Sequence, residues 1–224
     1  RPGAAHIGLP FDVQKAAVPA EELWADARYS QFPAQRIGPD PDDTAAVLEL
    51  LLAAKQPVIV CGGGVVLSNA EQELARLAER LDLPVCTTVS GQGSLAEIHP
   101  NCVGVVGSNG GRPSTRAVVD EADLVLFIGC RAGSVTTERW RTPAAGTKVA
   151  HIDNDAEVIG ACYETNAAMC ADARLALQAL NTLVDEASTV SGADGANRAR
   201  AAREPKWEAF NVLAASNDAP ILPE

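Results

Sequence analysis

Short apolar runs alternate with amphipathic stretches through the middle of the chain. The apolar runs, which are typical of buried strands, lie at residues 57–61, 84–88, 103–106, 123–128, 147–152 and 167–170. Between them, apolar side chains recur three and four residues apart, which predicts helices at residues 42–54, 69–82, 114–121 and 172–186. Continuous apolar strands that alternate with amphipathic helices predict an α/β, Rossmann-like fold. We expect three layers, with a parallel sheet covered by helices on both faces.

Ligands of such sheets bind beyond the carboxyl ends of the strands, so the loops there are the candidate site. The residues Gly62, Gly63 and Gly64 follow the first strand of the core. Glycines at this place let backbone N–H groups approach a phosphate. The dinucleotide fingerprint places another glycine where Leu67 stands, so an ordinary NAD-binding unit is not expected. A tight glycine turn without a ligand is the alternative.

Single charged residues follow three later strands. Arg131 could hold a phosphate through two hydrogen bonds, or it could pair with a carboxylate at the surface. Asp153 could accept hydrogen bonds from ribose hydroxyls, or it could cap the turn that follows. Asp172 precedes a helix, which favours a role as its N-cap. The pattern contains no convincing nucleophile and no Cys/His cluster with metal spacing, so no catalytic residue and no metal ligand is predicted.

The composition and charge of the chain exclude some classes of binding partner. The chain has 224 residues, 47% of them hydrophobic, and a formal net charge of −11, which argues against nucleic acid or an anionic membrane as partner. No apolar run approaches the roughly 20 residues of a transmembrane helix. The six cysteines form no CxxC pair, and we expect reduced thiols in a cytoplasmic protein. Residues 15–42 carry several prolines and residues 188–205 are small, polar and charged, so both segments are interpreted as linkers.

The order of motifs over roughly residues 1–187 resembles the central domain of thiamine-diphosphate-dependent enzymes, and among them the acetolactate synthase branch. In chain order the motifs are HIGLPFDVQ, PVIVCGGGV, LPVCTT, GQGS, ADLVLFIGCR and KVAHIDND. The resemblance implies the DHS-like NAD/FAD-binding fold for residues 43–187. It implies that residues 1–14 are the tail of a preceding pyrimidine-binding domain, including its last strand, and that residues 15–42 are a linker. Residues 188–224 would then contain a second linker and the start of the diphosphate-binding domain.

The resemblance also implies a function. The chain would be an excised central domain of an enzyme that acts on a 2-keto acid or a related substrate. It would be structural, with nucleotide binding as a second role left open, and not catalytic alone. Thiamine diphosphate and Mg²⁺ would be held by the missing pyrimidine- and diphosphate-binding domains, because this chain has no GDG motif. Those domains, and further copies in a homo-oligomer, are the expected partners.

Members of this family differ in the nucleotide that the central domain binds. The resemblance implies FAD in acetolactate synthases and pyruvate oxidases, ADP in oxalyl-CoA decarboxylase and none in several decarboxylases, and all three stay open here. The resemblance also implies which residues would contact the nucleotide. The pyrophosphate or ribose would lie against Gly62, Gly63 and Gly64, and the phosphates would contact Gly129 and Arg131. The flavin side would lie near Thr88 and Val89, with Gly107 and Gly110 lining the same site, and the adenosine portion would contact Asp153 and Asp172.

Two other classes of protein share parts of this pattern. A stand-alone FAD- or ADP-binding module, such as a domain of an electron-transfer flavoprotein, would also use a glycine loop after a strand. A sirtuin-like NAD-consuming enzyme would need a catalytic histidine in its own motif and commonly a zinc-binding cysteine quartet. This sequence has neither feature, which leaves the flavoprotein module as the alternative.

Overall fold

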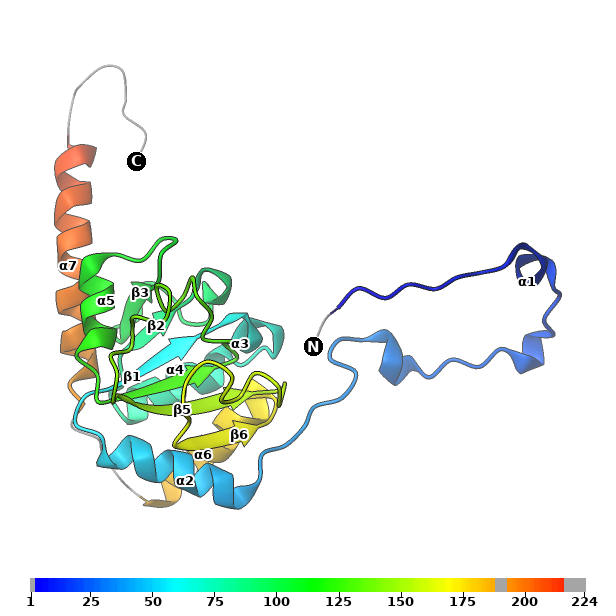
Figure 1. Cartoon of the computed structure of the whole chain (residues 1–224), viewed down its shortest axis with the longest axis horizontal. Coiled ribbons are helices and arrows are strands. Elements are labelled where there is room, and N and C mark those ends of the chain that lie inside the picture. The colour runs from blue at the N-terminus through cyan, green and yellow to red at the C-terminus, as the bar shows by residue number, and fades with distance from the viewer. Residues whose placement is uncertain (1–2, 188–192, 216–224) are drawn as a thin grey trace. The chain divides into compact units, whose positions relative to one another are not determined.

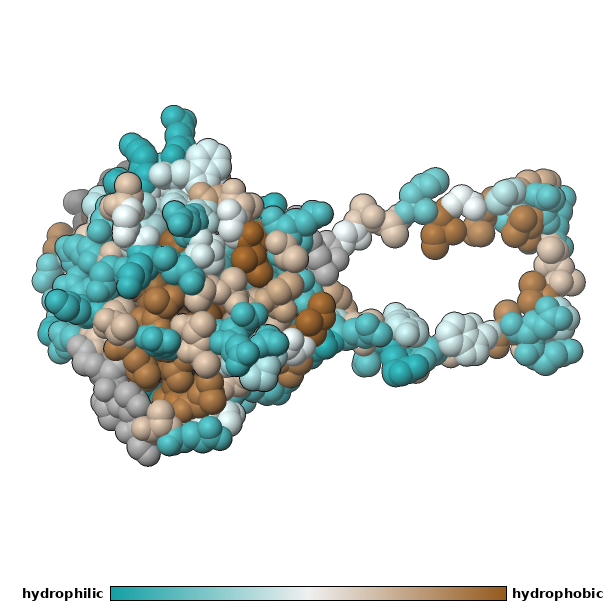
Figure 2. Space-filling model, turned by 60° about the horizontal axis from the view of Figure 1, so that its bottom comes forward, coloured by the Kyte–Doolittle hydropathy of each residue, from teal (hydrophilic) through white to brown (hydrophobic). Residues whose placement is uncertain are grey.

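The computed structural model describes residues 3–187 and 193–215, and it divides the chain after Arg36 into two units. The N-terminal segment, residues 3–36, contains the short helices α1 (Phe11–Lys15), η1 (Ala20–Glu22) and η2 (Ala27–Ser30). None of these helices has a buried residue, and brown apolar side chains stand free along the segment in Figure 2. The strand expected near residues 4–9 is not formed, because the segment contains no neighbouring strand to pair with.

The second unit is built on a six-stranded sheet in the order β3-β2-β1-β4-β5-β6 (Figure 1). The strands are β1 (Pro57–Cys61), β2 (Val85–Thr87), β3 (Cys102–Val105), β4 (Leu124–Ile128), β5 (Lys148–Asp153) and β6 (Ala167–Cys170). Every adjacent pair is parallel. The chain order reverses between β1 and β4, which makes that junction the switch point where α/β sheets bind ligands. The predicted α/β, Rossmann-like fold is confirmed.

Helices cover both faces of the sheet. The first face carries α2 (Pro41–Ala53), α4 (Glu71–Arg80) and α6 (Ala173–Ala187), and the second carries α5 (Pro113–Asp120) and α7 (Gly195–Ala214). Strand β1 shows why the layers form, since its side chains alternate between the two cores. Ile59 and Cys61 pack in the first core, whereas Val58 and Val60 pack in the second. Two short helices, α3 (Gly63–Leu67) and η3 (Val89–Gly91), follow β1 and β2.

The boundaries of the compact unit are wider than expected. Residues 195–205, interpreted as linker, form the first half of α7, and Ala199 and Ala202 are buried against the sheet. The small side chains that indicated a linker instead allow α7 to lie close to the strands. At the other end, the carbonyl of Ile37 accepts a hydrogen bond from the Asp172 amide at 2.9 Å, which attaches the last residues of the expected first linker to the sheet. The diphosphate-domain start expected at residues 216–224 lies outside the described residues.

Candidate functional site

The loop after β1 and the loop after β4 touch through their backbones. The Gly62 amide donates to the Ile128 carbonyl at 2.9 Å, and the Gly64 amide donates to the Gly129 carbonyl at 3.0 Å. A β-carbon on Gly62 would lie 2.1 Å from the Gly129 oxygen, and one on Gly64 would lie 2.6 Å from the Gly129 Cα. Glycine is therefore required at both positions by the close approach of the two loops, whether or not a ligand binds there.

The loop after β2 is fixed in the same manner. The Thr88 amide donates to the Cys61 carbonyl at 2.8 Å, and the Thr88 hydroxyl accepts from the Gly91 amide at 3.0 Å. This hydroxyl thus caps η3 and is buried. The neighbouring Val89 side chain is 48% exposed. Of these two predicted contacts, Val89 presents its side chain outward, whereas Thr88 is used within the fold.

The loop after β3 closes on the segment that follows β4. Gly107 has φ +100°, and a β-carbon there would lie 2.4 Å from the Val135 carbonyl. The Ser108 amide donates to that same carbonyl at 2.8 Å. Gly110, at φ +94°, is exposed. Both glycines have a positive φ, which other residues rarely adopt. Gly107 is buried against the segment that follows β4, so of the two only Gly110 is accessible to a ligand.

Arg131 is the predicted cation of the site. It is exposed, and within the described residues it makes no hydrogen bond or ion pair. The residue before it, Cys130, is buried, and its carbonyl lies 2.9 Å from His151 Nε2. Because burial lowers the pKa of His151, the ring is neutral near pH 7 and donates this hydrogen bond. The backbone that carries Arg131 is therefore anchored while its guanidinium faces solvent.

The two predicted aspartates differ. The half-buried Asp153 accepts the Asp155 amide at 3.0 Å through Oδ1, which forms a local turn. The buried Asp172 accepts the amides of Arg174 and Leu175 at 3.1 and 3.3 Å through one oxygen, as the N-cap of α6. The N-cap role that the sequence favours for Asp172 is present, and its amide also bonds to Ile37 as described above.

The sheet brings the predicted residues to one edge. The ends of the strands are in register, with Cys61 opposite Thr87 and Ile128, and Asp153 opposite Cys170. The loops that follow consequently line up in the order of the strands. Arg131 extends the strand at the switch point, between the glycine loop and Asp153. This edge could bind an elongated anion, to which the site would offer the positive charge of Arg131.

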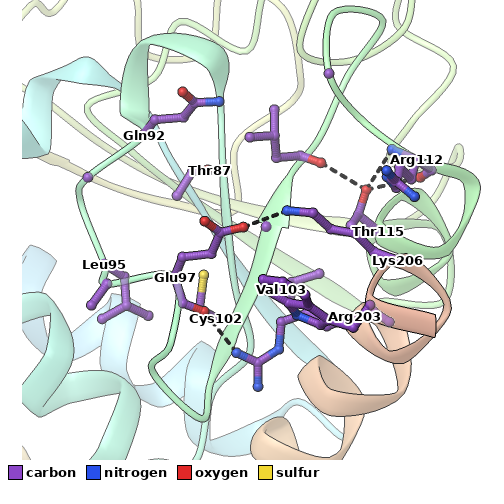
Figure 3. Close-up of a pocket in the computed structure, with 17 residues that line it drawn as sticks. Thr87, Gln92, Leu95, Glu97, Cys102, Val103, Arg112, Thr115, Arg203 and Lys206 are labelled. Atoms are coloured by element: carbon purple, nitrogen blue, oxygen red, sulfur yellow. Dashed lines mark hydrogen bonds and ion pairs between the residues drawn. The ribbon is translucent and has the colours of Figure 1, made fainter. Parts of the chain in front are cut away.

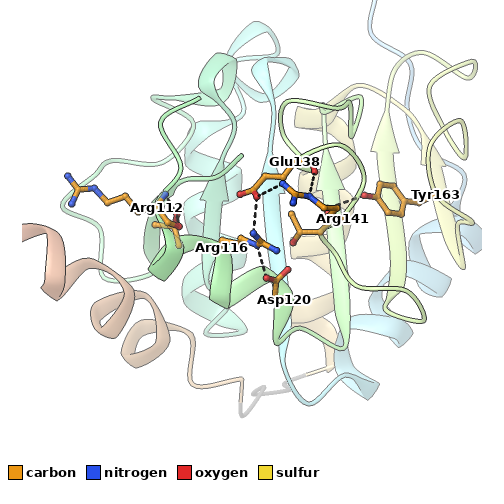
Figure 4. Close-up of polar contacts among 8 residues, drawn as sticks. Arg112, Arg116, Asp120, Glu138, Arg141 and Tyr163 are labelled. Carbon is orange, nitrogen blue, oxygen red and sulfur yellow. Dashed lines mark hydrogen bonds and ion pairs between the residues drawn. The ribbon is translucent and has the colours of Figure 1, made fainter. Parts of the chain in front are cut away.

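A second feature escaped the sequence analysis. Figure 4 shows Glu138 between two arginines: its Oε2 lies 3.0 Å from Arg116 Nη1 and 3.7 Å from Arg141 Nη2. Arg116 also pairs with Asp120 at 2.9 Å along α5. Glu138 and the next two residues, Arg139 and Trp140, all have φ between +48° and +62°, which is uncommon outside glycine. The ion pairs hold this strained turn against α5, and no sequence pattern signals a contact across 22 residues.

A pocket of about 550 Å³ lies along the edge strand β3 (Figure 3). Its walls come from β3, the segment 92–97, the start of α5 and the middle of α7. Of the predicted site residues it includes only Gly110. The sequence could not show it, because the segment and α7 are more than a hundred residues apart.

The chemistry of the described residues supplies no metal centre, since no group of three His, Cys, Asp or Glu side chains among them could hold an ion. The buried cysteines are not thiolates: burial raises the pKa of Cys130 to about 11 and also raises the pKa values of Cys61 and Cys86 above their ordinary value. Within the part that the structure describes, no helix is long and apolar enough to cross a membrane.

Known proteins resemble the chain in sequence. The family described as thiamine pyrophosphate enzyme, central domain, matches residues 44–180. A probable acetolactate synthase large subunit from Methanococcus aeolicus is 36% identical over 180 residues, which cover 80% of this chain and 30% of that protein. Isozyme 1 of the acetolactate synthase large subunit from Escherichia coli is 34% identical, over 83% of this chain and 32% of that protein. The chain thus spans about a third of the length of these relatives.

Solved structures share the fold. Benzoylformate decarboxylase from Polynucleobacter necessarius superposes with a TM-score of 0.61 at 22% identity, over 78% of this chain and 32% of that one. A thiamin diphosphate-dependent enzyme from Mycobacterium smegmatis gives a TM-score of 0.53 at 25% identity, over 66% of this chain and 28% of that one. The family match over residues 44–180 and the sequence relatives, which agree with the parallel sheet and its switch point, show that the chain belongs to the thiamine pyrophosphate enzyme family, as a central domain of the acetolactate synthase-like kind.

Proposed function

We propose that this chain serves as the central domain of an enzyme that acts on a 2-keto acid or a related substrate, and that it binds an adenine nucleotide, FAD or ADP. The catalytic cofactor, thiamine diphosphate with Mg²⁺, would be held by the pyrimidine- and diphosphate-binding domains of the parent enzyme. The length of the relatives supports this assignment, because they are about three times as long as the matched segment and so have room for the other two domains. The contribution of this chain would be architecture and the nucleotide site.

The observation that carries the nucleotide proposal is the free guanidinium of Arg131 at the switch point of the sheet. A guanidinium matches two phosphate oxygens at once, and an exposed one without a carboxylate partner among the described residues keeps its full capacity for a ligand. Asp153 follows the adjacent strand and uses Oδ1 in its own turn. Its Oδ2 is the atom that ribose hydroxyls would approach.

The glycine loop has a smaller part in this site than the motif suggests. Two of its three amides, those of Gly62 and Gly64, are already bonded to the β4 strand and loop. A pyrophosphate would therefore depend on Arg131 more than on a backbone cradle. Removal of that one side chain should abolish most of the affinity.

The experiment is an absorbance spectrum of the purified chain with added FAD, together with calorimetric titration of ADP. We expect saturable binding of at least one nucleotide, weakened at least tenfold by Arg131→Ala. Arg80→Ala is the matched control, because it removes an exposed arginine from α4 that pairs only loosely with Asp185, at 3.4 Å. Absence of saturable binding for both nucleotides, or equal affinity of wild type and Arg131→Ala, contradicts the proposal.

The same experiment addresses the alternative of a stand-alone flavoprotein module. Such a module would retain its flavin through purification and give a yellow protein without added FAD. A central domain whose site is completed by other domains would bind added nucleotide only.

The proposed partners are the missing domains and further copies of the enzyme. Along the N-terminal segment, large apolar side chains such as Trp24, Ile7 and Phe11 are 70–80% exposed. A row of exposed apolar side chains without a core marks a segment that packs on another surface. The domains that bind the cofactor are the surface that we propose for it.

A further inference from the structure

The pocket along β3 has the size and the lining of a small-molecule site. Its volume of about 550 Å³ lies within the range of roughly 300–1,000 Å³ that is usual for ligand pockets. Its apolar walls are formed by Leu95 of the segment 92–97, Val103 of β3 and Trp207 of α7. Figure 3 shows Leu95 and Val103 together with polar side chains that come from α5 and α7.

The charge of this pocket is opposite to that of the chain. Arg112, Arg203 and Lys206 line it against a single carboxylate, Glu97, whereas the whole chain carries a net charge of −11. An excess of positive charge in a concave apolar surrounding attracts anions, because the low-dielectric walls strengthen the local field.

The three cations differ in what they already hold. Arg203 donates to the carbonyls of Glu97, His99 and Pro100 at 2.9–3.1 Å, so it fastens the segment before β3 to α7. Lys206 Nζ lies 2.6 Å from a Glu97 carboxylate oxygen. The guanidinium of Arg112, by contrast, donates no hydrogen bond and makes no ion pair within the described residues. It is the cation available to a ligand.

We propose that this pocket binds an organic monocarboxylate, with its carboxylate on Arg112 and its apolar body against Trp207, Leu95 and Val103. One free guanidinium suits one carboxylate, whose two oxygens match its fork. Lys206 also attracts the carboxylate, but the ligand must compete with Glu97 for this ammonium group. Because the pocket shares only Gly110 with the predicted nucleotide site, the two sites can be occupied independently.

The test uses Trp207 as reporter. The chain contains three tryptophans, and Trp24→Phe with Trp140→Phe leaves Trp207 alone. Titration of this protein with 4-phenylbutyrate should change its fluorescence saturably, whereas the uncharged 4-phenylbutan-1-ol should bind at least tenfold more weakly. Arg112→Ala should weaken binding of the acid at least fivefold. Glu97→Gln, which frees Lys206, should strengthen it.

Two variants serve as controls. Arg76→Ala removes an arginine that pairs with Asp185 away from the pocket and should leave the titration unchanged. Arg131→Ala should also leave it unchanged, which separates this proposal from the nucleotide site. Should Arg112→Ala fail to fold, as judged by its thermal melt, Arg112→Gln takes its place. Equal affinity for the acid and the alcohol, no saturable signal, or no loss upon removal of the guanidinium overturns the proposal.

Discussion

Gly62 and Gly129 pack backbone against backbone, so closely that a β-carbon on Gly62 would lie 2.1 Å from the Gly129 carbonyl oxygen. The contact joins the ends of β1 and β4 at the switch point. Gly129 itself has φ +55°, and its amide donates to the Ile152 carbonyl at 2.8 Å, so it cannot easily move aside. The strands β1, β4 and β5 thus end in one rigid layer of backbone, next to which the candidate nucleotide site lies.

The first prediction concerns this contact. Gly62→Ala should lower the free energy of unfolding by about 3 kcal/mol, because the methyl group meets backbone atoms that are fixed by hydrogen bonds. Gly133→Ala is the control, since a β-carbon at Gly133 has no atom within 4 Å and should change stability by less than about 0.5 kcal/mol. Urea denaturation measures both. Equal stability of the two variants would show that the loops separate without cost.

The second prediction separates the two roles open to Asp172. Asp172→Ala should cost about 1 kcal/mol of stability, because the amides of Arg174 and Leu175 lose their acceptor. Asp172→Asn keeps an oxygen at the cap and should be close to wild type in a thermal melt. Nucleotide affinity then decides the second role. If the Asp172→Asn variant binds the nucleotide as well as wild type does, the residue is a cap and its negative charge is not a contact of the adenosine portion.

The third prediction tests how α7 is held. Arg203→Gln should lower the free energy of unfolding by about 2 kcal/mol, because three carbonyls before β3 lose a charged donor. Arg200→Gln removes a neighbouring arginine whose partner, Glu204, lies one turn away on the exposed side. That change should cost less than about 0.5 kcal/mol. A loss for Arg203→Gln no larger than for Arg200→Gln in urea denaturation would mean that packing alone holds the helix.

The sequence predicts the sheet well, because buried parallel strands are short runs of apolar residues that need no knowledge of their neighbours. Residues 57–61 and 167–170 are strands with the predicted bounds. The prediction is wrong where small residues have a packing role: the alanines of residues 195–205 indicate a linker, yet Ala199 is buried under a helix that completes the second core.

The site follows the same division. The placement of the candidate residues at the carboxyl edge of the sheet follows from topology, and the capping role of Asp172 depends on residues only two and three positions further on, so the sequence could predict both. The packing role of Gly62 could not, because its partner Gly129 is distant in sequence. The pocket along β3 depends on a pair, Glu97 and Lys206, that are 109 residues apart. Such contacts exist only once the fold has formed.

The last prediction is the effect of pH on stability through His151. Burial lowers the pKa of this side chain in the folded protein from its ordinary value of 6.5, although the Cys130 carbonyl and the charge of Asp153 act in the opposite direction. The unfolded chain therefore binds a proton more readily than the folded one. The contribution of neutral His151 to stability is fully present above pH 6.5 and is lost as the pH falls below it.

We expect the free energy of unfolding to decrease from about pH 7.5 towards about pH 5, with a contribution from this one group of at most about 1.4 kcal/mol per pH unit. His151→Gln preserves a side-chain donor for the Cys130 carbonyl but cannot titrate, so its stability should depend less steeply on pH. His99→Gln is the matched control, because His99 pairs with Glu79 near the surface and lies outside the second core. Urea denaturation at a series of pH values gives the three slopes. A slope for His151→Gln as steep as that of wild type would mean that other groups cause the acid sensitivity.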